Sequence, residues 1–255
     1  MFPVVDCRLH IEGECFPRDV DVRAASDLIS RSDRLCPPVT GAIYGTLLND
    51  SAEMAALRSA MYAPPYKAPP KAPILYVKPR NTLCGHGSPV VVPNDTVGVQ
   101  VGGSLGIVIG RTACRVSRSD ALDFVAGYTI VADMSVPHDL VYRPSVRYRA
   151  RDGFCVIGPS ITAKRHIGNA DDLQIRIQIN GVESCVGETA RAVRSVSALL
   201  ADVTDFMTLS AGDVLTMGVP HGAPAANAGD RVTVEIDGLP SLSFSMIAAL
   251  AGSQS

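Results

Sequence analysis

The chain has 255 residues, a formal net charge of −2 and 47% hydrophobic residues. This composition suits one large domain with its own core, alone or with a short N-terminal piece, and the small net charge argues against nucleic acid or an anionic membrane as partner. No run of about 18 apolar residues predicts a membrane span, and residues 1–6 lack the basic and apolar regions of a signal peptide.

The seven cysteines are an odd number and include no C-x-x-C pair. This pattern favours neither a disulfide framework nor a zinc site. It is typical of reduced thiols, and it therefore predicts a cytoplasmic protein.

The first 41 residues differ in character from the rest of the chain. A short helix is expected between Val20 and Ser32, and the prolines that follow Cys36 end it, because proline cannot continue a helix. We therefore expect an N-terminal extension over residues 1–41 and a main domain over residues 42–255.

A strand and a helix are expected to open the main domain. Residues 42–48 are typical of a buried strand, and residues 51–61 of a helix with Ser51 as its N-cap. Residues 62–73 then hold five prolines in twelve residues, which requires an extended chain. Because strand-like residues 74–77 follow at once, we favour a loop within one domain over a linker between two.

The remaining chain is rich in predicted strands. Residues 174–179 alternate between polar and apolar, as in a strand with one face in water, and Asn180-Gly181 is typical of a hairpin turn. The other expected strands are residues 90–92, 105–109, 129–132, 213–217 and 231–236.

Two helices interrupt these strands. One is expected over residues 119–125, capped by Ser117 or Ser119, and the other over residues 189–206, where apolar residues recur at helical spacing. Many strands with few helices indicate an α+β, mostly β fold.

Short motifs recur in order along residues 42–247. Their order and spacing resemble the fumarylacetoacetate hydrolase family, which implies that family's mixed β-sandwich roll. Some of them resemble the first half of the family's two-domain isomerases/decarboxylases of aromatic catabolism, in which residues 1–41 have no counterpart. The motifs include Lys78-Pro79-Arg80-Asn81-Thr82, Arg151-Asp152-Gly153-Phe154, Tyr142-Arg143-Pro144, Leu209-Ser210-Ala211-Gly212-Asp213 and Gly218-Val219-Pro220-His221-Gly222.

The resemblance implies a bound Mg²⁺ or Mn²⁺ held by three carboxylates. The two glutamates of the family's Glu-x-Glu strand fall at Gly102 and Ser104, and the third carboxylate falls at Asp133. Hard divalent ions need several oxygen ligands, so we expect metal binding to be weak or absent in this chain. Asp133 is then either a remnant ligand or a hydrogen-bonded residue at a strand end.

Three residues are candidates for catalysis by resemblance and by chemistry. Glu53 falls where the family has a lid-helix histidine, and it is either a base with a pKa raised by burial or a solvated helix residue. Lys78 directly follows an apolar strand and needs a partner. Asp133 completes the set.

A second group of residues is predicted to bind the carboxylates of a substrate. Arg149 replaces a family lysine and keeps its charge, and an arginine grips a carboxylate through two hydrogen bonds. The alternative for the whole group is a set of ordinary ion pairs. The candidates are Arg149, Arg151, Asp152, Arg143 and His221.

Three functions follow as hypotheses. The chain is a subunit of an isomerase/decarboxylase, acts on a small dicarboxylate or tricarboxylate, and forms a homodimer or pairs with a metal-bearing paralogous subunit. Alternatively it is an independent tautomerase, decarboxylase or hydrolase of an acylpyruvate-like acid, or a metal-free module that binds a diacid.

Overall fold

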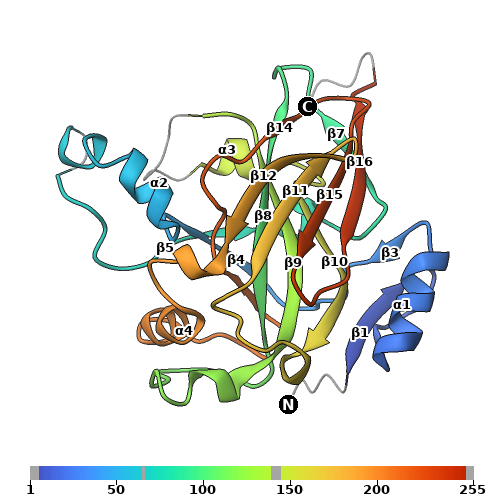
Figure 1. The fold of residues 1–255 in the computed structure, drawn as a ribbon, viewed down its shortest axis with the longest axis horizontal. Helices are drawn as coiled ribbons and strands as arrows, with labels where there is room; N and C mark the ends of the chain where they lie inside the picture. Colours follow the sequence, from blue (N-terminus) through green and yellow to red (C-terminus); the bar gives the residue numbers. More distant parts are fainter. Residues whose placement is uncertain (1–5, 65–66, 139–144, 251–255) are drawn as a thin grey trace.

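The computed structural model describes residues 6–64, 67–138 and 145–250. Its β-strands form two sheets that pack face to face, with short helices around their edges (Figure 1). This arrangement confirms the predicted α+β, mostly β fold. Within the described residues no helix is long and apolar enough to cross a membrane.

The larger sheet runs in the order β2-β1-β10-β9-β8-β13-β4-β5, with β3, β6 and β14 attached beside this path. The smaller sheet runs in the order β12-β11-β15-β16-β7. Strands of the larger sheet are β1 (Cys7–Ile11), β2 (Arg18–Val20), β3 (Leu35–Cys36), β4 (Ile43–Leu47), β5 (Ile74–Lys78), β6 (Leu83–Cys84), β8 (Val99–Ile109), β9 (Val125–Ser135), β10 (Cys155–Ala163), β13 (Val214–Thr216) and β14 (Ala225–Ala226). Strands of the smaller sheet are β7 (Pro89–Val92), β11 (Gln174–Ile179), β12 (Val182–Glu188), β15 (Arg231–Ile236) and β16 (Leu242–Ala248).

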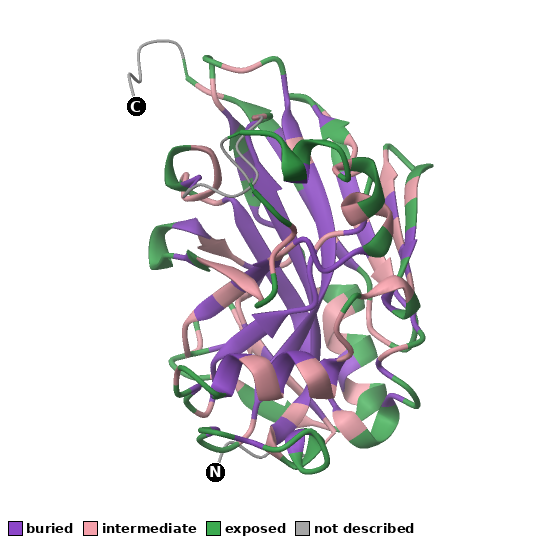
Figure 2. Cartoon of the chain, turned by 90° about the vertical axis from the view of Figure 1, so that its left-hand side faces the viewer, coloured by how far each residue is buried: buried purple, intermediate pink, exposed green. Residues whose placement is uncertain are grey.

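The main core lies between the two sheets, where the strands of Figure 2 are almost continuously buried. Gly103 on β8 permits this close approach, because a Cβ there would lie 2.8 Å from a methyl carbon of Val234 on the opposite sheet. β8 and β9 pair antiparallel at the centre, and Gly102 lies directly opposite Asp133. These two long strands therefore bring together Gly102, Ser104 and Asp133, the positions at which the sequence resemblance predicts metal ligands.

The α-helices are shorter than the sequence predicts. The helix expected at residues 20–32 is α1 (Val22–Arg31), and the one expected at 51–61 is α2 (Ser51–Ala56) followed by a 3-10 turn at Ala60–Tyr62. The prediction of Ser51 as N-cap is wrong. Asp50 caps α2, because its Oδ1 accepts hydrogen bonds from the backbone N–H groups of Ala52 and Glu53, both at 3.0 Å.

The helix predicted at residues 119–125 is only a 3-10 turn, Ala121–Phe124. The hydroxyl of Ser117 accepts a hydrogen bond from the backbone N–H of Asp120 at 3.3 Å, whereas the hydroxyl of Ser119 donates to the carboxylate of Asp120. A four-residue helix, α3 (Val146–Arg149), was not predicted.

The helix predicted at residues 189–206 begins late, as α4 (Val196–Thr204), with Ser195 as its N-cap. Its expected first turns are instead a 3-10 turn at Thr189–Arg191 and an extended segment. The side chain of Asn49 holds that segment, since its amide bonds both the N–H and the carbonyl of Arg194.

The hairpin at Asn180-Gly181 is confirmed, with φ of 54° and 78° at these residues. Several strands were missed, namely β1, β2 and β3 in the N-terminal segment, and β6, β10, β12, β14 and β16. β10 contains Gly158-Pro159, which argues against a central strand, and the sheet accommodates it with a register shift between Gly158 and Thr162.

Candidate functional site

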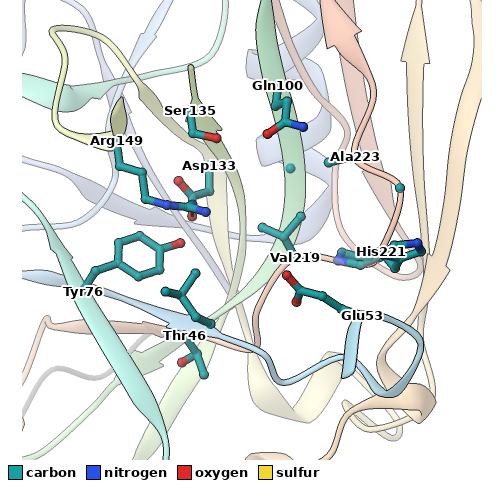
Figure 3. A pocket seen from close by; sticks show the side chains of 14 residues that line it. Thr46, Glu53, Tyr76, Gln100, Asp133, Ser135, Arg149, Val219, His221 and Ala223 are labelled. Atoms are coloured by element: carbon teal, nitrogen blue, oxygen red, sulfur yellow. Dashed lines mark ion pairs between the residues drawn. The ribbon is translucent and has the colours of Figure 1, made fainter. Parts of the chain in front are cut away.

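A cavity of about 280 Å³ lies beside the paired strands β8 and β9, under helix α2 and the loop that follows β13 (Figure 3). Its walls combine polar and apolar side chains. The polar side chains that line it belong to Thr46, Glu53, Tyr76, Gln100, Asp133, Ser135, Arg149 and His221.

Asp133 forms the centre of a buried charge cluster on one wall. Lys78 Nζ lies 2.5 Å from Asp133 Oδ1, and Arg149 Nη1 lies 3.6 Å from Asp133 Oδ2. Lys78 Nζ also donates to the backbone carbonyls of Met134, Arg149 and Phe154 at 2.9–3.0 Å. Lys78 therefore ties β9, α3 and the turn before β10 together, and it lies behind Asp133 rather than among the residues that line the cavity.

Burial acts on both members of the Lys78–Asp133 pair. It lowers the pKa of Lys78 to about 7 and raises the pKa of Asp133 to about 7, although the cation of Arg149 opposes the rise for Asp133. A proton can move between the two groups without changing their combined charge of zero. The two basic side chains Lys78 and Arg149 surround a single carboxylate, so the cluster attracts an anion.

Arg149 is held at the cavity by an aromatic ring. Its guanidinium carbon lies 4.8 Å from the ring centroid of Tyr76, a cation–π contact. Tyr76 in turn lies over Gly45, its cross-strand partner on β4, where any Cβ would collide with the ring. Glycine at position 45 therefore lets Tyr76 fold across the sheet and support Arg149.

Several buried polar atoms around the cavity are unsatisfied. Arg149 Nε, the Tyr76 hydroxyl and Thr46 Oγ1 have no hydrogen-bond partner within the described part of the chain. Buried polar groups in native proteins are nearly always paired. All three residues line the cavity.

Glu53 lies across the cavity from Asp133, and Figure 3 shows its carboxylate beside Val219 and the cavity loop. Burial and the neighbouring Asp50 raise the pKa of Glu53 to about 7, while Arg149 opposes the shift. The interpretation of Glu53 as a group facing a ligand thus has support in the geometry. A carboxyl group that titrates near 7 suits general acid–base chemistry.

Asn49 fixes the start of α2 relative to the cavity loop. Its Nδ2 donates to the carbonyl of Met217 at 2.8 Å, and its amide pairs with the backbone of Arg194. The position of Glu53 near the start of α2 therefore depends on the hydrogen bonds of the Asn49 side chain.

The residues present do not fit a divalent metal ion. A Cβ on Gly102 would lie 2.5 Å from both methyl carbons of Val219, so that side chain fills the space beside Asp133. Ser104 Oγ donates to the carbonyl of Gly218 at 2.7 Å, which uses its proton within the protein. Across the described ranges, no three His, Cys, Asp or Glu side chains form a group that could hold a metal.

The predicted acid-binding residues separate in the structure. Arg149 and His221 line the cavity, whereas Arg151 forms a bidentate ion pair with Asp95 at 2.7 and 2.9 Å. Asp152 accepts a hydrogen bond from Asn81 at 2.7 Å, and it does not line the cavity. Arg143 lies outside the described residues.

Sequence reasoning missed Thr46, Tyr76, Gln100 and Ser135. One signal was available for Tyr76, which stands two residues before Lys78 in the same strand and therefore on the same face. Gln100 and Ser135 are cross-strand partners on β8 and β9. Only the pairing of these strands places them at the cavity.

Residues 42–246 match the fumarylacetoacetate (FAA) hydrolase C-terminal family, and the chain belongs to that family. It is 36% identical over 202 residues to the 4-hydroxyphenylacetate degradation bifunctional isomerase/decarboxylase of Escherichia coli. That match covers 79% of this chain and 46% of the relative. The chain therefore spans about half the length of this curated relative.

Solved structures with the same fold include enzymes of related chemistry. The 5-carboxymethyl-2-hydroxymuconate delta-isomerase of Mycobacterium smegmatis superposes with a TM-score of 0.71 at 26% identity, covering 85% of this chain and 83% of that one. The maleylpyruvate hydrolase of Sphingobium sp. SYK-6, solved with manganese(II) and pyruvate, gives a TM-score of 0.69 at 26% identity, covering 85% and 74%.

Proposed function

We propose that the chain is a subunit of the isomerase/decarboxylase of 4-hydroxyphenylacetate (homoprotocatechuate) catabolism, and that its own cavity binds an acid without a tightly bound metal. The reactions would be the isomerisation of 2-hydroxyhepta-2,4-diene-1,7-dioate and the decarboxylation of 5-oxopent-3-ene-1,2,5-tricarboxylate. The similarity to one half of a bifunctional relative supports the subunit role. The observation that carries the metal-free site is the Lys78–Asp133–Arg149 cluster next to Gly102 and Val219.

In the proposed site Arg149 receives a carboxylate of the substrate. Its Nε and the Tyr76 hydroxyl are unsatisfied within the described residues and supply the hydrogen bonds. Glu53 as carboxylate removes the proton of the 2-hydroxyl group of the dienol, and the negative charge that develops on the oxygen faces Arg149. Glu53 then returns the proton to a carbon of the diene, which converts the enol to a 2-oxo acid, so no co-reactant is needed. Such acid–base catalysis contributes roughly 10²–10⁴-fold.

A paralogous subunit that retains the three carboxylates would bind the metal ion and supply the metal chemistry. This chain would pair with that subunit, or with a second copy of itself. Its seven thiols are all free, which suits the cytoplasm.

A second candidate function is an independent tautomerase, decarboxylase or hydrolase of an acylpyruvate-like acid. The specific observation in its favour is Glu53, whose pKa of about 7 in the cavity lets it act as base and acid near neutral pH. In that case the isolated chain should turn over a 2-oxo or enol acid in the presence of EDTA, and Glu53→Gln should abolish the activity.

Native co-purification with the metal-bearing subunit tests the first proposal. A stable complex, with isomerase activity greater than that of either chain alone, is expected. If no complex forms and the isolated chain turns over its acid, the independent enzyme replaces the subunit. Acid binding with no turnover in either preparation selects the metal-free binding module.

A further inference from the structure

A groove of about 520 Å³ lies between the N-terminal segment, residues 6–41, and the smaller sheet. One wall is the end of α1 with the residues that follow it, and the other is formed by β15, β16 and the loop before β7 (Figure 1). We call this cavity the segment groove. It shares no described lining residue with the cavity beside β8 and β9. Its first wall lies outside residues 42–246, which match the family.

Backbone contacts hold the two walls of the segment groove together. The N–H of Leu35 donates to the carbonyl of His86 at 2.9 Å, and the N–H of Gly87 donates to the carbonyl of Ser243 at 2.8 Å. A Cβ on Gly87 would collide with the carbonyl oxygen of Asp33, so glycine at this position permits the close approach. The two walls therefore have a fixed spacing.

The wall formed by the smaller sheet offers hydrogen-bond donors to an anionic group. Within the described residues the guanidinium of Arg231 has no ion-pair partner. His86 Nδ1 accepts a hydrogen bond from the backbone N–H of Ser243 at 3.2 Å, so the neutral ring carries its proton on Nε2. Burial, together with the cation of Arg231, lowers the pKa of His86 and keeps the ring neutral at pH 7. Arg231 and His86 thus suit a carboxylate.

The wall formed by the N-terminal segment offers acceptors to a cationic group. Asp33 is the single acidic residue among the described lining residues, and its carboxylate has no partner in the described part of the chain. The C-terminal end of α1 also lines this wall, at Ile29 and Ser30. A helix carries a partial negative charge at its C-terminal end. An ammonium group therefore suits this wall.

Serine hydroxyls supply much of the remaining lining. Those of Ser32, Ser241 and Ser245 have no hydrogen-bond partner within the described ranges. The hydroxyl of Ser243 already pairs with that of Thr233 at 3.0 Å. Because the three other hydroxyls can still donate and accept, they favour a polar group of a ligand over an apolar one.

We infer that the segment groove binds a small zwitterion, namely an α-amino acid with a polar, uncharged side chain. The carboxylate of the amino acid contacts Arg231 and His86, its ammonium group contacts Asp33, and its side chain faces the serine hydroxyls. The opposite charges of the two walls carry this inference, because a ligand that holds both charges on neighbouring atoms complements both walls at once. A plain anion would gain from one wall and be repelled by Asp33 on the other.

Titration calorimetry of the full chain with L-serine, L-threonine, L-asparagine and L-glutamine tests the inference, and at least one of the four should bind. Each amino acid is compared with its amine, which lacks the carboxylate, and with its acid, which lacks the ammonium group. For L-serine these counterparts are ethanolamine and 3-hydroxypropanoate. Each counterpart should bind at least about tenfold more weakly, because it leaves one charged wall without a partner.

Two variants locate the binding at the segment groove. Arg231→Gln and Asp33→Asn should each raise the Kd of the amino acid by about tenfold to a hundredfold. Arg80→Gln and Asp27→Asn are the matched controls, since both residues are exposed and neither lines the groove. Both controls should keep the wild-type Kd. Arg149→Met should keep it too, because Arg149 lines the other cavity.

The outcomes decide between three readings of the groove. If none of the four amino acids binds, or if R231Q and D33N bind as tightly as the wild type, the inference is overturned. If 3-hydroxypropanoate binds as tightly as L-serine, the groove takes a plain anion and the zwitterion is overturned. Binding that is lost in R149M would place the amino acid in the cavity beside β8 and β9 instead. The proposed function stands or falls separately, because its cavity shares no described residue with the groove.

Discussion

The neighbouring strands β8 and β9 contain the three positions at which the resemblance to the family predicts metal ligands, and the two strands differ at these positions. β9 keeps its carboxylate, Asp133, which contacts Lys78 and Arg149. β8 has Gly102 and Ser104, and the space beside them is taken by Val219 and by a hydrogen bond to Gly218. Lys78 and Arg149 therefore lie beside the carboxylate of β9, whereas the side chain of Val219 packs against β8.

The largest expected effect is on stability, when the cation beside Asp133 on β9 is removed. Lys78→Met removes the closest cation from a carboxylate whose side chain is 2% exposed, and it leaves three backbone carbonyls without their donor. We expect a loss of about 3–5 kcal/mol in the free energy of unfolding, measured by urea denaturation.

The matched control for that variant is Lys164→Met, because Lys164 donates to one carbonyl at the surface. The double variant Lys78→Met/Asp133→Leu removes both charges and should recover part of the loss. If K78M were as stable as the wild type, the buried pair would not hold β9 and α3 together.

The next effect concerns ligand binding. Arg149→Met should weaken oxalate binding by about tenfold to a hundredfold, since a charged donor is lost from a desolvated site. Arg149→Lys should retain part of the affinity because it keeps the charge. Arg176→Met serves as the control, since Arg176 pairs with Asp237 on the smaller sheet. Equal affinity in R149M would remove Arg149 from the site.

A larger residue at position 102 tests the packing of Val219 against β8. Gly102→Ala places a methyl group against Val219, and we expect a loss of about 1–3 kcal/mol in thermal or urea unfolding. Val219→Ala in the same chain should relieve most of the loss. Gly168→Ala is the matched control, because a Cβ there meets no atom within 4 Å. A fully stable G102A variant would show that Val219 does not pack into the former ligand space.

The smallest effect is the pH dependence from Glu53. Its folded-state pKa is raised from 4.5 to about 7, so the carboxyl is neutral below about 7 and becomes an anion as the pH rises. Oxalate affinity should then fall by about fivefold as the pH passes through 7, which corresponds to roughly 1 kcal/mol of repulsion.

The same shift affects stability with a defined sign. Because the folded state holds the proton more tightly, the contribution of Glu53 to stability is complete below pH 4.5 and is lost as the pH rises through about 7. Glu53→Gln should flatten both profiles. A profile that is unchanged in E53Q would assign the titration to another group.

Local patterns predicted the parts of the fold that depend on one segment. The alternation over residues 174–179 and the Asn180-Gly181 turn gave β11 and its hairpin correctly. The same reasoning failed for β10, because Pro159 argues against a central strand and only the neighbouring strands explain how it is accommodated. The start of α4 also depended on a distant residue, Asn49.

The candidate site likewise has features that a single segment predicts and features that depend on distant residues. The missing carboxylates at Gly102 and Ser104 are visible in the sequence, because they depart from a local motif. The packing of Val219 against Gly102 joins residues more than one hundred positions apart, and the ring of Tyr76 beneath Arg149 depends on a glycine in another strand. No local pattern carries such contacts.

Titration calorimetry of oxalate, in EDTA and then in Mn²⁺, tests the central claim most directly. We predict that oxalate binds with the same Kd in both, that Mn²⁺ alone gives no heat, and that Arg149→Met weakens oxalate binding equally in both. Oxalate binding that requires Mn²⁺ would contradict the account, because it would mean that Asp133 still holds a working metal centre in place of the Lys78–Asp133–Arg149 cluster.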